Sequence, residues 1–224
     1  MSAVSAAGLY RRHGRRWALL DVSFEIPQGA LAMVTGRNGS GKSTLLRVLA
    51  TALRPDRGTV AIDGHDVRAA RDEVRGRIAL LGHRTHLYEP LTALENLAVR
   101  ARFLGSTARP DDLTALLDQV GLAARAGDAV QTFSAGMRQR LALATVLQRA
   151  ARVVLLDEPY GHLDAEGSLL VDRLLGTLRA RGATVLMATH LIERGRALCD
   201  HALVLDEGRL KFSGPSAQLE VHDP

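Results

Sequence analysis

One segment carries the strongest chemical pattern in the chain. Residues 36–44 fit the spacing G-x-x-x-x-G-K-[ST] at every fixed position. Glycines let a backbone wrap closely around an anion, so that successive N–H groups point inward as donors. Lys42 adds a positive charge for the β- and γ-phosphates, and Ser43 offers a hydroxyl to Mg²⁺. The predicted phosphate contacts are Gly36, Arg37, Asn38, Gly39, Ser40, Gly41, Lys42, Ser43 and Thr44.

The flanks of this segment agree with a phosphate-binding loop. Residues 31–35 read as a short buried strand, and residues 44–50 read as a helix. A strand, a glycine loop and a helix form the setting in which the helix N-terminus adds partial positive charge. A dinucleotide-binding fingerprint is excluded, because Gly39-Ser40-Gly41 is followed at its third position by Thr44 instead of glycine or alanine.

A pair of acidic residues gives the second strong signal. Four hydrophobic residues at 153–156 predict a buried strand, and Asp157 and Glu158 follow at its carboxyl end. A carboxylate there suits a hard cation beside the phosphates, so Asp157 is a candidate Mg²⁺ ligand. Glu158 is placed to polarise an attacking water as a catalytic base.

Length, composition and charge limit the class of protein. The 224 residues are 46% hydrophobic and 24% charged, which is typical of a folded globular protein. No apolar run reaches the roughly 18 residues of a membrane span, and the N-terminus lacks the layout of a signal peptide, so we expect a cytoplasmic location. The net charge of +5 comes without interleaved aromatic residues, which disfavours nucleic acid as a partner. Cys199 is expected to be a small buried residue.

The order of elements predicts one α/β domain over 1–224. A mainly parallel sheet with an antiparallel β portion forms the catalytic core at 1–83 and 151–224. Residues 84–150 read as helical, beginning with a capping box at Thr92 and Glu95, and form an inserted subdomain.

In this order of motifs the chain resembles the ATP-binding cassette family over nearly its whole length. The resemblance rests on the phosphate loop, the helical insert, Phe133-Ser134-Ala135-Gly136-Met137, the acidic strand end, Leu163-Asp164 and His190. It implies a P-loop ATPase that uses ATP and Mg²⁺ and pairs head to tail with a second copy. It also implies that Ser134 and Gly136 contact ATP held by the partner, and that His190 senses the γ-phosphate. Lys42, Glu158 and His190 are the implied catalytic residues.

Three features depart from the family pattern. In the predicted signature, Met137 stands where glutamine is usual and Ala135 replaces a glycine. The glutamine expected after the strand at 78–81 is missing, and Gly82-His83-Arg84 stands there, with Arg84 at the aligned position. Arginine cannot ligate a metal, so either water or His83 takes that place. The ring that stacks on adenine is also open among Tyr10, His13 and Trp17, and the register favours His13.

The family implies a motor subunit that drives integral membrane permease chains from the cytoplasmic face of the membrane. The permease would dock in the groove between core and insert near residues 83–89, where His86, Leu87 and Tyr88 are candidate contacts. Residues 82–84 and 91–97 most resemble the ATPase of the bacterial haem exporter of cytochrome c maturation. The alternative is the ATPase of a drug, lipid or polysaccharide exporter. A protein acting on ribosomes or nucleic acid, and a binder that does not hydrolyse ATP, are less favoured.

Overall fold

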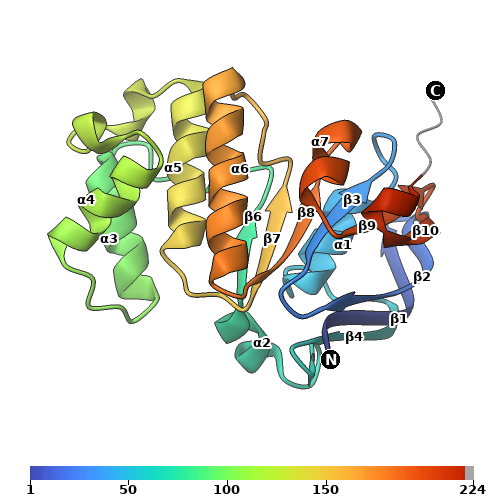
Figure 1. Cartoon of the computed structure of the whole chain (residues 1–224). Coiled ribbons are helices and arrows are strands. Elements are labelled where there is room, and N and C mark those ends of the chain that lie inside the picture. The colour runs from blue at the N-terminus through green and yellow to red at the C-terminus, as the bar shows by residue number, and fades with distance from the viewer. Residues whose placement is uncertain (220–224) are drawn as a thin grey trace. The chain divides into compact units, whose positions relative to one another are not determined.

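The computed structural model describes residues 1–219 and confirms the predicted α/β class (Figure 1). The chain divides into two compact units. The core contains Met1–Gly82, Ala151–Glu158 and the chain from Leu174 onward. The helical unit contains His83–Ala150 and Pro159–Arg173. The sequence placed residues 159–173 in the core, whereas their contacts group them with the helical unit.

The larger sheet of the core has the strand order β10-β9-β3-β8-β7-β6. Its strands are β3 (Leu31–Thr35), β6 (Ile78–Leu81), β7 (Val153–Asp157), β8 (Thr184–Ala188), β9 (His201–Asp206) and β10 (Arg209–Pro215). All neighbouring pairs are parallel except β10 with β9. Strands β3, β7 and β8 are buried along their whole length, which explains their unbroken runs of apolar residues.

The smaller sheet is antiparallel, with the order β2-β1-β4-β5. Its strands are β1 (Ser2–His13), β2 (Arg16–Pro27), β4 (Arg57–Ile62) and β5 (His65–Asp66). Strand β1 was not predicted from the sequence. The first part of β1 consists of small residues, and its extended form depends on pairing with β2 on one side and β4 on the other.

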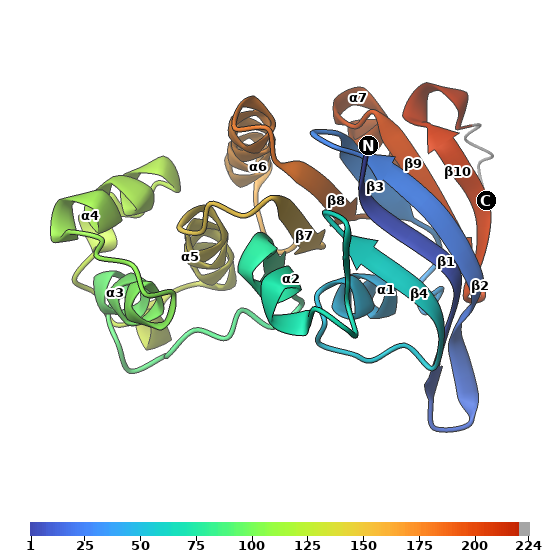
Figure 2. The ribbon, with the colours of Figure 1, turned by 90° about the horizontal axis from the view of Figure 1, so that it is seen from below.

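Helix α1 (Lys42–Leu49) packs within the core that both sheets share (Figure 2). Leu45, Leu46 and Leu49 are fully buried in one cluster with residues of β1, β3 and β7. Burying a leucine side chain stabilises the fold by about 1.5–3 kcal/mol. This packing fixes α1 and therefore the loop that precedes it. The core also contains the short helices α2 (Arg71–Arg77) and α7 (Ile192–Leu198).

The helical unit contains α3 (Ala93–Phe103), α4 (Pro110–Gln119), α5 (Ala135–Leu147) and the first part of α6 (Ala165–Ala180). The predicted capping box of α3 is present: the Thr92 hydroxyl accepts from the Glu95 N–H, and the Glu95 carboxylate accepts from the Thr92 N–H. Such a cap is worth about 1 kcal/mol of helix stability. It fixes where α3 begins and therefore where the preceding loop ends.

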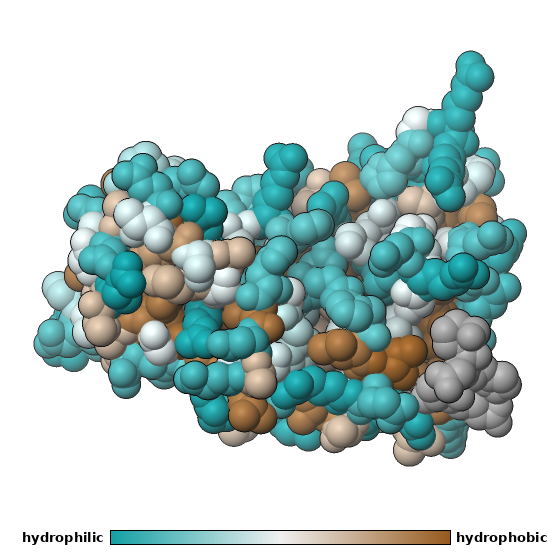
Figure 3. Space-filling view, turned by 90° about the horizontal axis from the view of Figure 1, so that it is seen from above, coloured by the Kyte–Doolittle hydropathy of each residue, from teal (hydrophilic) through white to brown (hydrophobic). Residues whose placement is uncertain are grey.

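The face seen in Figure 3 is largely hydrophilic, with apolar residues in small groups. Large apolar side chains are exposed at Met1, Tyr88, Phe103 and Leu169. Among residues 1–219 no helix combines the length and the hydropathy that a membrane crossing requires. Cys199 is buried, as predicted, and burial raises the pKa of its thiol to about 12.

Candidate functional site

The predicted catalytic residues of the core come from the carboxyl ends of three parallel strands. Val34 of β3 pairs with Ala188 of β8, and Asp157 of β7 pairs with the same Ala188. The residues that follow each strand therefore leave the sheet at one edge, where ligands of open α/β sheets bind. This register brings the phosphate loop, Glu158 and His190 to one edge although they are far apart in sequence.

The phosphate loop requires glycine at two positions. Gly36 has φ +137° and Gly41 has φ +112°, a region that other residues rarely adopt. A Cβ atom on Gly36 would lie 1.9 Å from the carbonyl oxygen of Leu205, and one on Gly41 would lie 2.5 Å from that of Ala18. The backbone of the loop is thus held against its neighbours, with no room for side chains at these positions.

Lys42 and Ser43 stand at the start of α1, directly after the loop. The Lys42 ammonium donates to the carbonyl oxygens of Gly36 and Arg37 at 2.8 and 3.1 Å. The Ser43 hydroxyl donates to the Asp157 carboxylate at 2.9 Å. A serine hydroxyl and a carboxylate are oxygen ligands of the kind that Mg²⁺ takes alongside substrate phosphates and water. Residues 1–219 hold no cluster of three or more His, Cys, Asp or Glu residues that could hold a metal ion.

Glu158 follows Asp157 with a left-handed backbone, at φ +53°. Its N–H still donates to Ala188 O at 2.9 Å, so the turn is anchored to β8. Its carboxylate lies 2.9 Å from Nδ1 of His190. A carboxylate accepts, so Nδ1 is the donor in this pair. Strained backbone of this kind concentrates at functional sites.

The three candidate adenine contacts separate in the structure. Tyr10 and Trp17 pack edge to face, with their ring centroids 5.6 Å apart. The guanidinium of Arg12 covers Trp17 at 5.2 Å. His13 is exposed, and its Nε2 lies 3.3 Å from the hydroxyl of Thr44 in the phosphate segment. His13 is therefore the ring that reaches the nucleotide loop, while the other two engage each other.

The helical unit carries the other half of the predicted site. An open cleft of about 520 Å³ is lined by Ser134, Ala135, Gly136, Met137, Arg140, His162, Leu163 and Asp164. The Ser134 hydroxyl caps α5 by accepting from the Met137 N–H at 3.2 Å. A Cβ on Gly136 would lie 2.9 Å from His162 O, so glycine lets the two loops approach. The cleft brings the predicted signature and Leu163-Asp164 together.

Asp164 is held as a carboxylate in this cleft. Its Oδ1 accepts from the Gly167 N–H at 2.7 Å and lies 3.4 Å from the Arg140 guanidinium. The Gly167 hydrogen bond, with Arg140 in support, keeps the pKa of Asp164 below its ordinary value. Asp164 therefore caps the start of α6 and orients Arg140 toward the cleft.

Sequence reasoning missed the role of Asn96. This side chain is only 4% exposed and forms four hydrogen bonds to the preceding loop. Its carbonyl oxygen accepts from the Tyr88 N–H, and its amide donates to the carbonyls of Tyr88, Leu91 and Thr92. The sequence contained the signal, since an asparagine on the apolar side of a helix needs buried partners. Asn96 fixes the loop that carries the candidate permease contacts.

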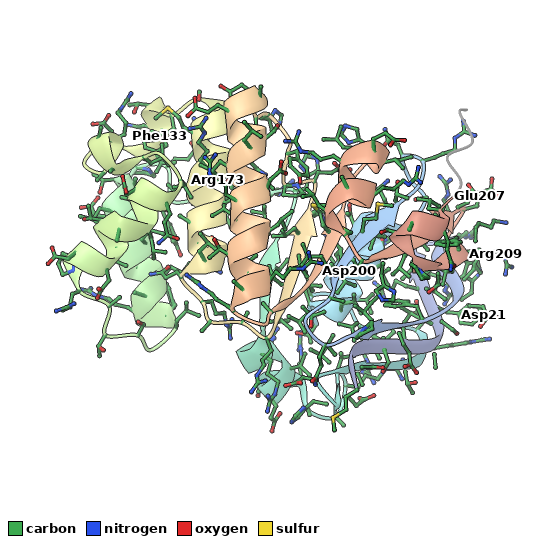
Figure 4. All side chains as sticks on the ribbon, viewed as in Figure 1. Asp21, Phe133, Arg173, Asp200, Glu207 and Arg209 are labelled. Atoms are coloured by element: carbon green, nitrogen blue, oxygen red, sulfur yellow. The ribbon has the colours of Figure 1, made fainter. Side chains whose placement is uncertain are left out.

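The turn at residues 206–208 was also not predicted to touch the phosphate loop. Gly208 N–H donates to Ser40 O at 3.0 Å, and Gly208 O accepts from Leu20 N–H at 2.7 Å. Arg16, Arg37, Asp206 and Glu207 line a pocket of about 280 Å³ with the loop. Glu207 and Arg209 are labelled in Figure 4 at the end of the core where β10 begins. Only tertiary structure reveals this contact, because the two segments lie far apart in sequence.

The replacement for the missing glutamine lies just after β6. Both His83 and Arg84 are exposed. They belong to the helical unit, whereas Gly82 closes the core segment. The identity of the group that takes the place of the glutamine therefore stays a prediction, as do the nucleotide contacts of the individual residues.

Comparison with known proteins identifies the family. The sequence model of the ABC transporter family matches residues 19–161. The daunorubicin resistance ATP-binding protein DrrA3 of Streptomyces coeruleorubidus is 37% identical over 98% of this chain and 70% of its own length. The Nod factor export ATP-binding protein I of Bradyrhizobium diazoefficiens is 32% identical over 98% of this chain and 73% of its own length.

A solved structure gives the same result for the fold. It is a dimeric ATP-binding cassette in a post-hydrolysis state, bound to ADP and Pi. It is 26% identical, covers 95% of this chain and 98% of its own, and superposes with a TM-score of 0.87.

These relatives correct one expectation from the sequence. Residues 82–84 and 91–97 suggested a haem exporter of cytochrome c maturation, yet the relatives are named for drug resistance and Nod factor export. The residues that suggested a haem exporter belong to short sequences that the ATPases of several kinds of exporter share. The alternative of a drug, lipid or polysaccharide exporter fits better. This chain belongs to the ABC transporter family and is an ATP-hydrolysing, ATP-binding subunit of that family.

Proposed function

We propose that the chain is the ATPase subunit of an exporter that moves a drug-like molecule, or one resembling a Nod factor, through separate permease chains. The observation that carries the catalytic part is the convergence of Ser43, Asp157, Glu158 and His190 at one sheet edge beside the phosphate loop. The relatives named for drug resistance and Nod factor export support the cargo class.

The chain's own residues divide the work of hydrolysis. The N–H groups of residues 38–43 and the ammonium of Lys42 bind the triphosphate, and His13 lies where the adenine ring would stack. Ser43 and Asp157 would hold Mg²⁺, which supplies charge neutralisation on the phosphate oxygens when bound. Glu158 accepts a proton from the attacking water, and His190 orients the Glu158 carboxylate through its Nδ1.

We further propose that two copies assemble head to tail. The solved relative bound to ADP and Pi is a dimer, which supports this assembly. In such a pair the cleft formed by Ser134, Gly136 and Asp164 would cover the γ-phosphate bound by the other copy. The hydroxyl of Ser134 and the backbone donors near Gly136 at the start of α5 suit an anion. Hydrolysis by one copy alone would then be slow, because each site lacks these donors until the partner arrives.

The permease would bind the helical unit, and the chain would thereby lie at the cytoplasmic face of the membrane. A groove of about 350 Å³ is lined by Thr85, His86, Leu87, Tyr88, Asn96, Val99, Arg100, Phe103, Leu104, Thr145 and Arg149. Phe103 is 80% exposed and Tyr88 is 52% exposed, so two aromatic anchors flank the groove. Burial, with Arg149 nearby, lowers the pKa of Arg100. An amphipathic permease segment with a carboxylate would match this mixture of apolar and cationic side chains. The groove lies within the helical unit, whereas the sequence placed it between core and insert.

Two experiments test this function at different levels. ATP hydrolysis by the purified chain with its co-expressed permease is compared with that of Glu158→Gln, which we expect to bind ATP and hydrolyse it at least about a hundredfold more slowly. Efflux of daunorubicin and of a Nod factor is then measured in a deletion strain complemented with either form. Wild-type hydrolysis without rescue of either efflux would leave the ATPase standing and reject the proposed cargo class.

A further inference from the structure

A second pocket of the core lies away from the predicted ATP site. It has a volume of about 270 Å³ and is lined by Thr51, Leu53, Arg54, Pro55, Val67, Arg68 and Arg71. These residues come from the turn after α1, the stretch after β5 and the start of α2. Three lining side chains are cationic and none is anionic. None of the lining residues belongs to the phosphate loop or to the acidic end of β7, so the pocket is separate from the nucleotide site.

The structure holds two of these arginines in place through backbone carbonyls. Arg68 donates to Pro55 O at 2.7 Å, and Arg71 donates to Thr51 O at 3.0 Å. Each anchor uses one N–H of a guanidinium that has five, and neutralises none of its charge. The positive charges are therefore positioned at the pocket and remain available to a ligand.

The neighbouring carboxylates are engaged elsewhere. The Asp56 carboxylate accepts from the backbone N–H of Arg12 at 2.7 Å and pairs with the Arg11 guanidinium at 3.8 Å. The Asp66 carboxylate accepts from the backbone N–H groups of Arg68 and Ala69 at 2.8 and 2.9 Å. Asp63 pairs with the Arg77 guanidinium at 2.8 Å. Within residues 1–219, Arg54, Arg68 and Arg71 form no ion pair, while arginines just outside the pocket do.

Thr51 adds a strained backbone to the pocket. This β-branched residue has φ +58° and is 5% exposed. A left-handed conformation is rare for such a residue and costs about 1–3 kcal/mol. Its carbonyl is the one that holds Arg71, and its hydroxyl accepts from Nε of Arg75 at 3.1 Å. The strained turn thus carries the acceptors that orient two arginines.

The chemistry of the lining specifies a class of ligand. Guanidinium groups match phosphate oxygens in geometry and charge. Leu53, Pro55 and Val67 add an apolar wall beside them. The volume lies just below the roughly 300–1,000 Å³ of pockets that enclose drug-sized ligands. A phosphate ester with a short apolar or polyol body fits, and a whole nucleotide is too large.

We propose that Arg54, Arg68 and Arg71 form a binding site for a small phosphate ester, distinct from the ATP site. The ester is either a free phosphorylated metabolite or the headgroup of an anionic lipid. Both sources present the same phosphate to the same three guanidinium groups.

The test uses the full chain with its ATP site filled. In a Glu158→Gln background with saturating MgATP, binding of glycerol 3-phosphate is measured by calorimetry. Binding to vesicles of phosphatidylglycerol and of phosphatidylcholine is measured by flotation. The test variant is Arg54→Gln/Arg68→Gln, which leaves the Arg71 anchor on Thr51 intact. The matched control is Arg152→Gln/Arg181→Gln, which removes the same charge from exposed positions outside the pocket.

We expect the test variant to lose at least about tenfold in affinity, because hydrogen bonds to a phosphate from two charged groups are removed. The control should bind like the parent. All forms should still unfold cooperatively, and the test variant should show at most a small fall in melting temperature from the lost Arg68 bond to Pro55 O. Binding of glycerol 3-phosphate identifies a soluble ester, whereas binding of phosphatidylglycerol vesicles alone identifies a lipid headgroup. Equal binding by the test variant and the control, or no binding of either probe by the parent, would overturn the proposal.

Discussion

Nδ1 of His190 lies 2.9 Å from the Glu158 carboxylate, and the two residues come from the ends of adjacent strands β8 and β7. Their side chains are 68% and 35% exposed, so the pair faces solvent at the sheet edge. A base that accepts a proton from water must be oriented before it acts, and this contact provides the orientation. Glu158 is therefore held by its backbone through Ala188 O and by its side chain through His190.

Removing either member of this pair should slow hydrolysis more than it weakens ATP binding. We expect Glu158→Gln to lower kcat by about 10²–10⁴-fold, the usual contribution of general-base catalysis. His190→Ala should lower kcat less, because it removes orientation and leaves the carboxylate. Steady-state hydrolysis and nucleotide affinity are measured in parallel. Glu193→Gln, an exposed acid on α7, is the control and should hydrolyse ATP normally. A fall in affinity with unchanged kcat would contradict this role.

Replacing Gly36 should destabilise the loop and the core together. In Gly36→Ala the new Cβ would meet the Leu205 carbonyl at 1.9 Å, so the backbone must shift. We expect a loss of about 1–3 kcal/mol in unfolding free energy, together with loss of ATP binding. Gly176→Ala is the matched control, because it lies within α6 with nothing within 4 Å of the added Cβ. That change should stabilise the protein by about 0.5–1 kcal/mol. Urea unfolding of both variants tests the contrast, and equal effects would refute it.

Asn96 should matter for coupling to the permease more than for hydrolysis itself. Asn96→Ala leaves the Tyr88 N–H and three carbonyls without their partner, and we expect a loss of about 2–3 kcal/mol in unfolding free energy. The loop with Tyr88 would lose its fixed position, so stimulation of ATP hydrolysis by the permease should fall. Hydrolysis by the chain alone should persist. Gln119→Ala on the exposed side of α4 serves as the control. Undiminished stimulation in Asn96→Ala would argue against docking at this loop.

Asp200 should make stability depend on acidic pH. Burial tends to raise its pKa, but hydrogen bonds from Arg179 and from the Leu31 N–H outweigh burial and lower it below the ordinary 3.8. A lowered folded-state pKa gives stability that is complete above about pH 4 and is lost as pH falls through the folded value. Arg179 and Asp200 are 46% and 45% exposed, so solvent screening weakens their pair and the Leu31 bond dominates.

The comparison of wild type with Asp200→Asn tests this dependence. At pH 7 we expect the variant to be about 1 kcal/mol less stable, because the amide loses the charge-assisted bond to Leu31. The difference should shrink as pH falls from about 4 through the lowered folded-state pKa, where wild-type Asp200 becomes protonated and the two side chains become alike. Urea unfolding at several pH values measures it. A difference that stays constant down to pH 2.5 would exclude Asp200 as the source.

Local sequence patterns predicted the parts of the site that lie on buried strands. The strand expected at 31–35 matches β3, because continuous apolar runs are typical of strands buried on both faces. The end of β7 beside Asp157 was predicted on the same basis. The capping box of α3 was also confirmed, since capping depends on residues close together in sequence.

The parts that could not be predicted depend on contacts between distant segments. β1 has few large apolar residues and extends because β2 and β4 pair with it. The edge-to-face pair of Tyr10 with Trp17 and the contact of His13 with Thr44 were not predicted, and adenine stacking on His13 stays a prediction. The division at Pro159 needed the contacts of residues 159–173 with the helical unit. No window along the sequence contains these relationships.

The contact between Gly208 and Ser40 has a consequence for synthesis of the chain on the ribosome. The phosphate loop emerges first, whereas β8 and β9, which flank β3, and the turn at 206–208 emerge only after the whole helical unit. At roughly 5–20 residues per second, the loop waits on the order of ten to thirty seconds for these partners. A growing chain therefore carries the nucleotide motif long before it can bind a nucleotide. Productive ATP binding by a newly made subunit is thus delayed until the turn at 206–208 has been synthesised.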